Sequence, residues 1–295
     1  MHTPVLLQEV LNIFDPQPGQ TYIDATVNGG GHAREIAKRV GERGRVIGID
    51  WDCDIIREAG IKNQESGMQN MDLVCENYTR MQHIAHERGI KAVNGILFDL
   101  GFSSYHVDRA GRGFTFAKDE PLDMRYHPAP DRMTAADIVQ RYSEKELSDM
   151  FTRYGEERFA RRIARFICAE RRGQKITTTK RLAEIARRAY PPAARGSRIH
   201  PATRAFQALR IAVNDELASV SAGLPAAASL LASGGVIAVI AFHSLEDRIV
   251  KEYMKTRGVA GGLRILTQKP IRPRPEEIAQ NPRARSARLR AAIRL

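Results

Sequence analysis

Residues 24–32 read DATVNGGGH, and this stretch decides the fold that we expect for the chain. It begins at the end of the β-rich run TYIDAT, residues 21–26, and leads into a stretch with helical character, so it forms a strand-to-helix turn. Successive glycines let the backbone pass close to a ligand, and the helix start presents free amide donors beside it. The turn is therefore a candidate ligand-binding element.

Further β-rich runs alternate with helical stretches on the C-terminal side of this turn. They lie at residues 45–50, 71–75 and 93–100, and an apolar run, VIAVIAF, follows at 236–242. Strands that alternate with helices predict a mainly parallel sheet with crossover helices. The fold class that we predict is therefore α/β.

The middle of the chain breaks this rhythm and shows helical patterns only. Thr134 and Ser143 each have an acidic residue three positions later, which is the signature of a capped helix start. Apolar residues recur with helical spacing from Phe159 to Ile167, and a similar pattern from Thr177 to Tyr190 stops at two prolines. These patterns indicate a helical region inside the α/β sequence.

We accordingly predict two domains. Residues 106–205 form an inserted helical domain, and residues 1–105 together with 206–295 form the α/β core. Much of the remaining surface of the helix that starts near Phe159 is basic, with Arg161, Arg162, Arg165, Arg171 and Arg172.

The charge balance points to a polyanionic partner. The chain has 295 residues with 43% hydrophobic content, enough for a well-buried core. Its 46 lysines and arginines against 34 acidic residues give a formal net charge of +12, which attracts nucleic acid. From charge alone, a soluble protein with an arginine-rich surface is an equally good interpretation.

The cysteines and the apolar runs indicate a cytoplasmic protein. Cys53, Cys75 and Cys168 lie far apart, so their spacing indicates no metal site and no disulfide framework, and we expect reduced, mostly buried thiols. No apolar run approaches the roughly 20 residues of a membrane span. The N-terminus MHTPVLLQEV lacks the basic start and apolar core of a signal peptide. We therefore expect no membrane partner and no metal.

Asp50 ends the second predicted strand about 20 residues after the glycine turn, the distance at which nucleoside-binding α/β folds offer a carboxylate to ribose hydroxyls. An empty turn is the better interpretation of the glycines alone, but the turn and Asp50 together predict a nucleoside site. That site fits a dinucleotide or S-adenosylmethionine, so a nicotinamide-dependent oxidoreductase remains a rival. The glycine spacing differs from G-x-G-x-x-G, which favours S-adenosylmethionine.

Asp99 ends the fourth predicted strand, at the carboxyl edge of the sheet where ligands of such folds bind. A carboxylate there can accept hydrogen bonds from an exocyclic amine and stabilise the positive charge that develops as a methyl group is transferred. The alternative is a carboxylate that caps the following turn.

Two polar stretches are candidates for substrate contacts. FHSLEDR, residues 242–248, follows the last apolar strand and predicts a substrate-facing loop. After Pro201 the chain predicts one amphipathic helix, in which Gln207, Arg210 and Asn214 share a face that either binds substrate or is solvated.

The C-terminal stretch NPRARSARLR, residues 281–290, concentrates arginines. They either grip phosphates or belong to a frayed basic tail.

Stretches in the same order over nearly the whole chain resemble the bacterial 16S ribosomal RNA (cytosine-N4) methyltransferases. They are HTPVLLQEV, the turn from DAT to GGGH, ILFDLGFSS, RGFTFAKDEPLDMR, YGEERFARRIAR, HPATRAFQALRIAVN, FHSLEDRIVK and NPRARSARLR. The resemblance implies a Rossmann-like, S-adenosylmethionine-dependent methyltransferase core with an inserted helical domain. It also implies that the substrate is a cytidine in the decoding region of small-subunit ribosomal RNA, as RNA or as the assembled subunit. The oligomeric state stays open between a monomer and a homodimer.

The resemblance carries site residues over to this chain. The implied cofactor contacts are Gly30, Gly31, His32, Asp50, Tyr78, Asp99 and His106. Asp99 is also the expected catalytic residue. We expect RNA contacts from the matching stretches, at Arg112, Asp123, Arg125, Gln207, Arg210, Asn214, His243, Ser244 and Arg248.

This chain departs from the family pattern near the cofactor contacts. It has Asn28 where the family usually has glycine, Tyr105-His106 where it has Pro-Gln, and Tyr78 where phenylalanine is common. Asparagine enters left-handed backbone conformations more easily than most residues. We therefore expect the turn to be preserved.

A second rival function is that of a noncatalytic RNA-binding protein. Such a protein would need neither Asp50 nor Asp99, which argues against this alternative.

Overall fold

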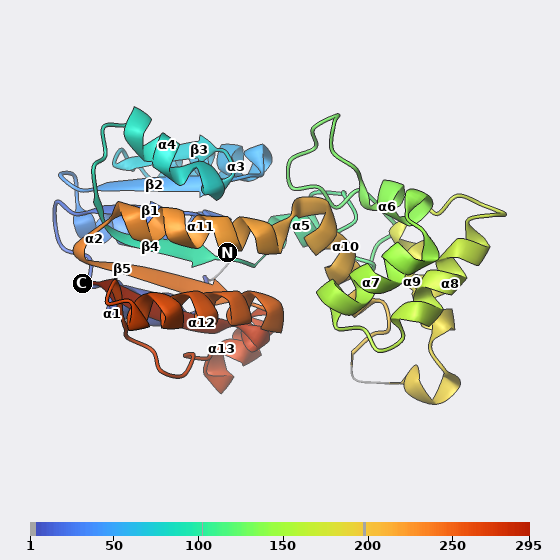
Figure 1. The fold of residues 1–295 in the computed structure, drawn as a ribbon. Coiled ribbons are helices and arrows are strands. Elements are labelled where there is room, and N and C mark those ends of the chain that lie inside the picture. The colour runs from blue at the N-terminus through green and yellow to red at the C-terminus, as the bar shows by residue number, and fades with distance from the viewer. Residues whose placement is uncertain (1–3, 102, 197–198) are drawn as a thin grey trace. The chain divides into compact units, whose positions relative to one another are not determined.

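The predicted strands all belong to one sheet in the computed structural model, which describes residues 4–101, 103–196 and 199–295 (Figure 1). The strands that match the predicted runs are β1 (Thr21–Asp24), β2 (Arg45–Asp50), β3 (Met71–Cys75), β4 (Val93–Asp99) and β5 (Leu231–Ala241). They are mutually parallel, in the order β3-β2-β1-β4-β5. The α/β prediction is confirmed.

Helices cover this sheet. They are α1 (Leu7–Phe14), α2 (Gly31–Val40), α3 (Cys53–Glu65), α4 (Met81–Glu87), α11 (Glu216–Leu230), α12 (Ser244–Val259) and α13 (Pro275–Gln280), with 3-10 turns at Tyr78–Arg80 and Pro282–Ser286. Buried residues of α4, α11 and α12 pack on alternate strand residues such as Ile23, Ile47 and Phe98. Within the described ranges, no helix is long and apolar enough to span a membrane.

The chain divides into two units, one of residues 1–103 and 217–295 and one of residues 104–216. The second unit is helical and contains α5 (Ser104–Asp108), α6 (Ala135–Arg141), α7 (Glu144–Gly155), α8 (Ala160–Glu170), α9 (Thr179–Ala189) and α10 (Thr203–Asn214), with a 3-10 turn at Pro192–Ala194. It extends beyond the expected limit at residue 205, because α10 packs on α7 and its Leu209 and Val213 belong to the helical core.

Local capping signals locate the helix starts of this unit. The Thr134 hydroxyl accepts a hydrogen bond from the Asp137 amide while the Asp137 carboxylate accepts one from the Thr134 amide, and Ser143 and Glu146 repeat the arrangement. Both predicted capping boxes are confirmed. They satisfy amides that the first helical turn leaves without partners.

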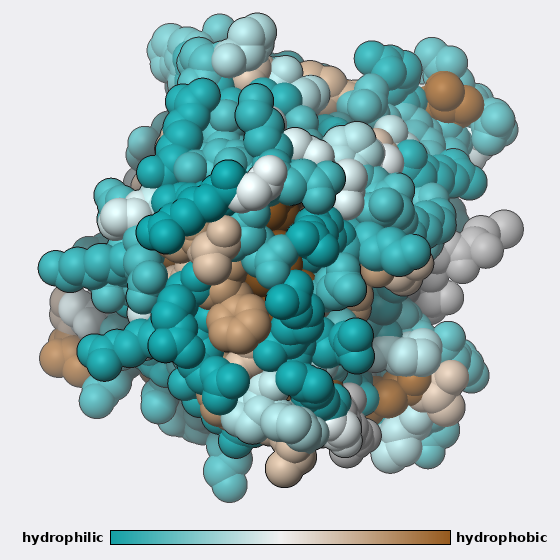
Figure 2. Space-filling view, turned by 90° about the vertical axis from the view of Figure 1, so that its right-hand side faces the viewer, coloured by the Kyte–Doolittle hydropathy of each residue, from teal (hydrophilic) through white to brown (hydrophobic). Residues whose placement is uncertain are grey.

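The helical unit carries a basic face on α8. Arg161, Arg162 and Arg165 are exposed there, and Arg158 lies just before the helix with its guanidinium 4.6 Å from the centre of the Phe159 ring. Figure 2 views the molecule from the right-hand side of Figure 1, and the surface that it shows is mostly hydrophilic. The apolar stripe of α8 is buried, because Ile163 and Ile167 belong to the core.

The C-terminal arginine stretch is neither a frayed tail nor wholly a surface for phosphates. Residues Arg288–Arg294 form β7, antiparallel to β5, and β6 (Leu263–Ile265) pairs with its other side. Arg290 donates from Nε and Nη2 to Asp247 at 2.6 and 3.2 Å, and Arg288 donates to the same carboxylate at 3.3 Å. These arginines hold α12 to the added strand.

Removing Arg290 should destabilise the fold. The Arg290 and Asp247 side chains are nearly buried, at 9% and 13% exposure, so Arg290→Ala leaves a carboxylate without its main partner. We expect the free energy of unfolding in urea to fall by about 3 kcal/mol. The matched control is Arg285→Ala, at an exposed position in the Pro282–Ser286 turn, with an expected change within about 0.5 kcal/mol. Equal effects for both variants would contradict the structural role of Arg290.

Candidate functional site

The glycine turn adopts a conformation that its sequence dictates. Asn28 and Gly30 have φ values of 47° and 73°, in the left-handed region that glycine and asparagine tolerate best. A Cβ atom on Gly31 would collide with the Pro4 ring, whereas one on Gly29 would meet no atom within 4 Å. The backbone at residue 29 therefore borders open space, as close approach to a ligand requires.

Asp50 is oriented by backbone amides at the end of β2. Its Oδ2 accepts a hydrogen bond from the Asn28 amide at 2.9 Å, and its Oδ1 accepts one from the Asp52 amide at 3.0 Å. Burial raises the pKa of Asp50 to about 7, although these amide hydrogen bonds act to lower it. The structure thus brings the predicted ribose carboxylate to the glycine turn.

Asp99 is held at the end of β4 by the same turn. Its backbone amide donates to the Thr26 hydroxyl at 2.6 Å, and the Asn28 side-chain amide donates to its carbonyl oxygen at 3.1 Å. Asparagine at position 28 is therefore compatible with the turn and adds a tie between strand ends.

The Asp99 carboxylate is buried, with 8% of the residue exposed. His32 Nδ1 lies 3.7 Å from its Oδ2, while Oδ1 has no hydrogen-bond partner among the described residues. Burial, followed by repulsion from Glu246, raises the pKa of Asp99 to about 7, and the Gly101 amide acts to lower it. A buried oxygen without a partner is suited to a donor group on a ligand.

Asp24 is a site residue that our sequence reasoning did not single out. It is 1% exposed at the end of β1, and its carboxylate accepts a hydrogen bond from the Thr26 amide at 3.3 Å. Burial and then repulsion from Asp99 raise its pKa well above the usual range, although the Thr26 amide acts to lower it. The signal was present in the sequence, since an acid at the end of an apolar strand, two residues before a threonine, can order the turn.

Tyr78 begins the short helix after β3 and is half-buried. Its ring contacts Phe98 edge-to-face with 5.3 Å between ring centres, and a Cβ on Gly223 would lie 2.8 Å from the ring. Packing against Phe98 and α11 therefore holds the ring in place.

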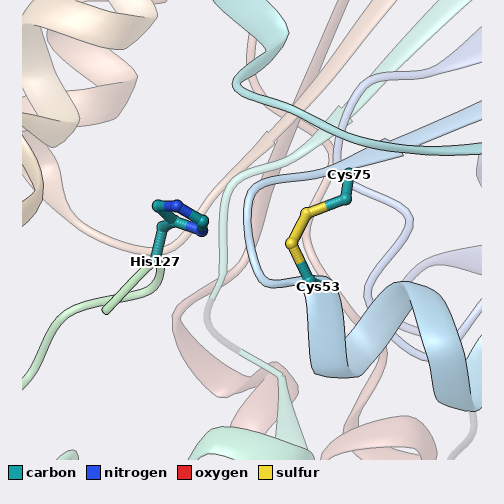
Figure 3. Close-up of side chains that lie close together, drawn as sticks. All are labelled: Cys53, Cys75 and His127. Carbon is teal, nitrogen blue, oxygen red and sulfur yellow. A yellow bond between two sulfur atoms is a disulfide. The ribbon is translucent and has the colours of Figure 1, made fainter. Parts of the chain in front are cut away.

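Cys53 and Cys75 form a disulfide (Figure 3), which corrects the prediction of reduced thiols. The prediction of mostly buried thiols is also wrong, because Cys75 is exposed and Cys168, which is free, is half-buried. The parallel pairing of β2 with β3 places Asp50 opposite Cys75, and Cys53 follows three residues after Asp50. Only this pairing brings the two sulfur atoms together.

The predicted substrate-facing loop FHSLEDR is in fact the start of α12. His243 caps the helix, and the buried Glu246 accepts hydrogen bonds from the Phe242 and His243 amides at 2.9 and 3.2 Å. A histidine-led capping box resembles a polar loop in sequence, which explains why the loop prediction is wrong, while the substrate contacts expected of these residues stay a prediction. Ser244 lies in the first turn of α12, and Arg248 is exposed on it.

Several predicted RNA contacts lie together in the helical unit and hold the segment 123–126. Arg125 pairs with Asp123 at 2.8 Å. Asn214 donates to the Met124 carbonyl at 2.7 Å and accepts from the Tyr126 amide at 2.8 Å. Because Met124 has a φ of 64°, these bonds stabilise a strained backbone.

The other predicted residues of this unit also have partners within it. Arg112 donates to the Tyr126 carbonyl at 2.8 Å, and Gln207 donates to the Tyr154 carbonyl at 3.0 Å. Arg210 forms two hydrogen bonds with Glu216, at 2.8 and 3.0 Å. His106 is buried, with its ring centre 4.8 Å from that of Phe114 and 4.9 Å from that of Tyr126.

A mostly parallel sheet in the order β3-β2-β1-β4-β5-β7-β6, with antiparallel β7, a glycine turn after β1 and carboxylates at the ends of β2 and β4, is typical of a Rossmann-like, S-adenosylmethionine-dependent methyltransferase. The model of the MraW methylase family matches residues 1–295, and the chain belongs to that family.

Curated relatives match the chain over its whole length. The chain is 46% identical to "Ribosomal RNA small subunit methyltransferase H" of Syntrophotalea carbinolica, over 100% of this chain and 98% of that one. The proteins of the same name from Persephonella marina and Deinococcus deserti are each 46% identical over 100% of this chain, covering 99% and 94% of their own lengths.

The residues present fit S-adenosylmethionine. The Asp50 carboxylate lies beside the glycine turn, where it would hold ribose hydroxyls, the backbone at Gly29 borders open space, and Asp99 offers a carboxylate oxygen without a partner among the described residues.

Cofactor affinity should depend on pH through Asp50. Because its pKa is raised to about 7, the carboxylate is protonated below that pH and accepts ribose hydroxyls poorly. We expect the dissociation constant of S-adenosylmethionine, measured by calorimetry, to rise by up to about tenfold per pH unit below pH 7. Asp50→Asn should bind weakly at pH 8 and lose the part of this dependence that Asp50 contributes, whereas Asp99→Asn, which removes the other carboxyl with a pKa of about 7, should keep that part. A wild-type slope in Asp50→Asn would assign the titration to another group.

Proposed function

We propose that the protein transfers the methyl group of S-adenosylmethionine to the exocyclic N4 of a cytidine in the decoding region of small-subunit ribosomal RNA. The observation that carries this proposal is the buried Asp99 carboxylate at the carboxyl end of β4, whose Oδ1 lacks a hydrogen-bond partner within the described part of the chain. The printed names of the relatives, ribosomal RNA small subunit methyltransferase H, support the choice of substrate.

In this proposal, Asp99 makes the exocyclic amine of cytosine a better nucleophile. The exocyclic amine of cytosine is a poor nucleophile because its lone pair is delocalised into the ring. In its ionised form, Asp99 accepts a hydrogen bond from the N4–H group, orients the lone pair and takes up the proton released by transfer. S-Adenosylmethionine supplies a methyl group that is already activated on a sulfonium.

The cofactor contacts in this proposal come mainly from the α/β unit. Asp50 orients the ribose, the backbone at Gly30 and Gly31 lies along the ligand, and Tyr78 stacks on the adenine. His32, 3.7 Å from Asp99, borders the reacting end. His106 enters through the family resemblance, and in the structure its buried ring packs on aromatic neighbours.

We assign substrate recognition to the inserted helical domain, predicted at residues 106–205. Within residues 158–204 the acidic side chains are Glu170 and Glu184, and both form ion pairs with Arg181. The α8 arginines at positions 161, 162 and 165 have no ion pair among the described residues, so they are available for phosphates.

The other RNA contacts in this proposal rest on two kinds of argument, the structure for some residues and the family resemblance for the rest. Arg112, Asp123, Arg125 and Asn214 shape the strained segment 123–126, which could present a rigid surface to the base. Gln207, Arg210, His243, Ser244 and Arg248 rest on the resemblance. We further infer that the protein acts in the cytoplasm. Comparing the rate of methyl transfer to naked ribosomal RNA with the rate to assembled small subunits would identify the form of the substrate.

Asp99→Ala should abolish catalysis without unfolding the protein. We expect transfer of labelled methyl groups to small subunits that lack the modification to fall by about 10²- to 10⁴-fold, because the variant has no proton acceptor. Nucleoside mass analysis should identify N4-methylated cytidine as the wild-type product, and thermal unfolding serves as the folding control. Near-wild-type turnover by a folded Asp99→Ala variant would contradict the assignment. Cofactor binding without transfer by the wild type would support the noncatalytic alternative.

Replacing Arg161, Arg162 and Arg165 together with alanine should weaken substrate binding. We expect a higher KM for small subunits with little change in kcat. We also expect the slope of the logarithm of the binding constant against the logarithm of the salt concentration to become shallower by about 0.7 to 0.9 for each phosphate that the variant no longer neutralises. The control replaces Lys38, Arg39 and Arg43, three exposed basic residues of the α/β unit, with alanine. An equal effect of the control would show that only net charge matters.

A further inference from the structure

The Cys53–Cys75 disulfide joins two segments that carry proposed adenosine contacts. Cys53 is the first residue of α3, three residues after Asp50, and Cys75 is the last residue of β3, three residues before Tyr78. Asp50 is the parallel partner of Cys75 in the sheet, and its carbonyl accepts a hydrogen bond from the Glu76 amide at 3.0 Å. The disulfide, drawn in Figure 3, therefore joins the residue paired with Asp50 in the sheet to the residue three positions after Asp50, the carboxylate that we propose for ribose binding.

The disulfide is accessible to reagents in solution. Cys75 is exposed, and Cys53 is half-buried. β3 is the terminal strand of the sheet, and none of its residues is fully buried. Few buried apolar contacts hold such a strand end, so a covalent bond there contributes much to keeping it ordered.

We propose that Cys53 and Cys75 form a reversible redox site whose oxidised state favours cofactor binding. In the disulfide form, the start of α3 and the end of β3 are joined, which holds Asp50 and Tyr78 in the geometry that the adenosine needs. In the dithiol form, the ladder between β2 and β3 persists, but the segments beyond it gain freedom. Binding must then order them again, which weakens affinity.

The redox step is a thiol–disulfide exchange with a dithiol reductant. A reductant thiolate attacks the exposed Cys75 sulfur, the bond between the cysteine sulfurs breaks, and Cys53 leaves as a thiolate that takes up a proton. The second reductant thiol then displaces Cys75, so the reductant becomes a disulfide while the protein gains two electrons and two protons. Exchange with a small disulfide runs the reaction backwards.

The test compares cofactor binding by the full chain in its two redox states. The protein is equilibrated with oxidised glutathione or with reduced dithiothreitol, and free thiols are counted by alkylation and mass analysis. The dissociation constant of S-adenosylmethionine is then measured by calorimetry. We expect the reduced protein to bind about three- to tenfold more weakly. Cys53→Ser/Cys75→Ser should bind like the reduced protein in both conditions. Cys168→Ser, which alters the free cysteine of the helical unit, should keep the full response.

Two results would overturn the inference. One is an equal dissociation constant in the two states, and the other is that both thiols stay reduced with oxidised glutathione. The inference rests on the proposed cofactor contacts, and Asp50→Asn separates the two failures. If Asp50→Asn weakens binding while the redox state does not, only the redox inference fails. If Asp50→Asn binds like the wild type, the cofactor placement itself is wrong.

Discussion

Hydrogen bonds from the turn after β1 tie three strand ends into one site. Asn28 donates its backbone amide to the Asp50 carboxylate and its side-chain amide to the Asp99 carbonyl, while Thr26 accepts from the Asp99 amide. The turn can do this because Asn28 adopts a left-handed conformation and Gly30 follows with the same sign of φ. These hydrogen bonds, together with the pairing of β1 with β2 and β4, fix the relative positions of Asp50 and Asp99, the carboxylates that we propose for ribose binding and catalysis.

The same turn brings three buried carboxyl groups together, which makes their ionised forms unfavourable. Asp24, Asp50 and Asp99 all have raised pKa values, because burial penalises their charge and neighbouring carboxylates repel each other. Such groups destabilise the fold when ionised, and perturbed acids of this kind gather where ligands or reacting groups stabilise them. A sulfonium cofactor brings positive charge to this site. Structure and proposed chemistry therefore agree on why these acids lie together.

Several residues of the helical unit that we propose as RNA contacts also stabilise its backbone. Arg125, Arg210 and Asn214 are partnered by neighbouring groups and hold backbone segments in place. The exposed arginines of α8 lie on the opposite side of that helix from the buried Ile163 and Ile167, as an amphipathic pattern requires. A sequence pattern shows that a residue faces away from the core, but partners from distant segments determine whether it is available to a ligand.

Local signals in the sequence determined much of this protein. The β-rich runs, the glycine turn, the capping boxes at Thr134 and Ser143 and the carboxylates at two strand ends all depend on residues near in the chain, and the structure has them where predicted. Long-range pairing decided the rest. Arg290 meets Asp247 because β7 pairs with β5, and Cys75 meets Cys53 because β2 and β3 are parallel neighbours. Neither contact has a local signature, since each joins segments whose proximity exists only after the sheet has formed.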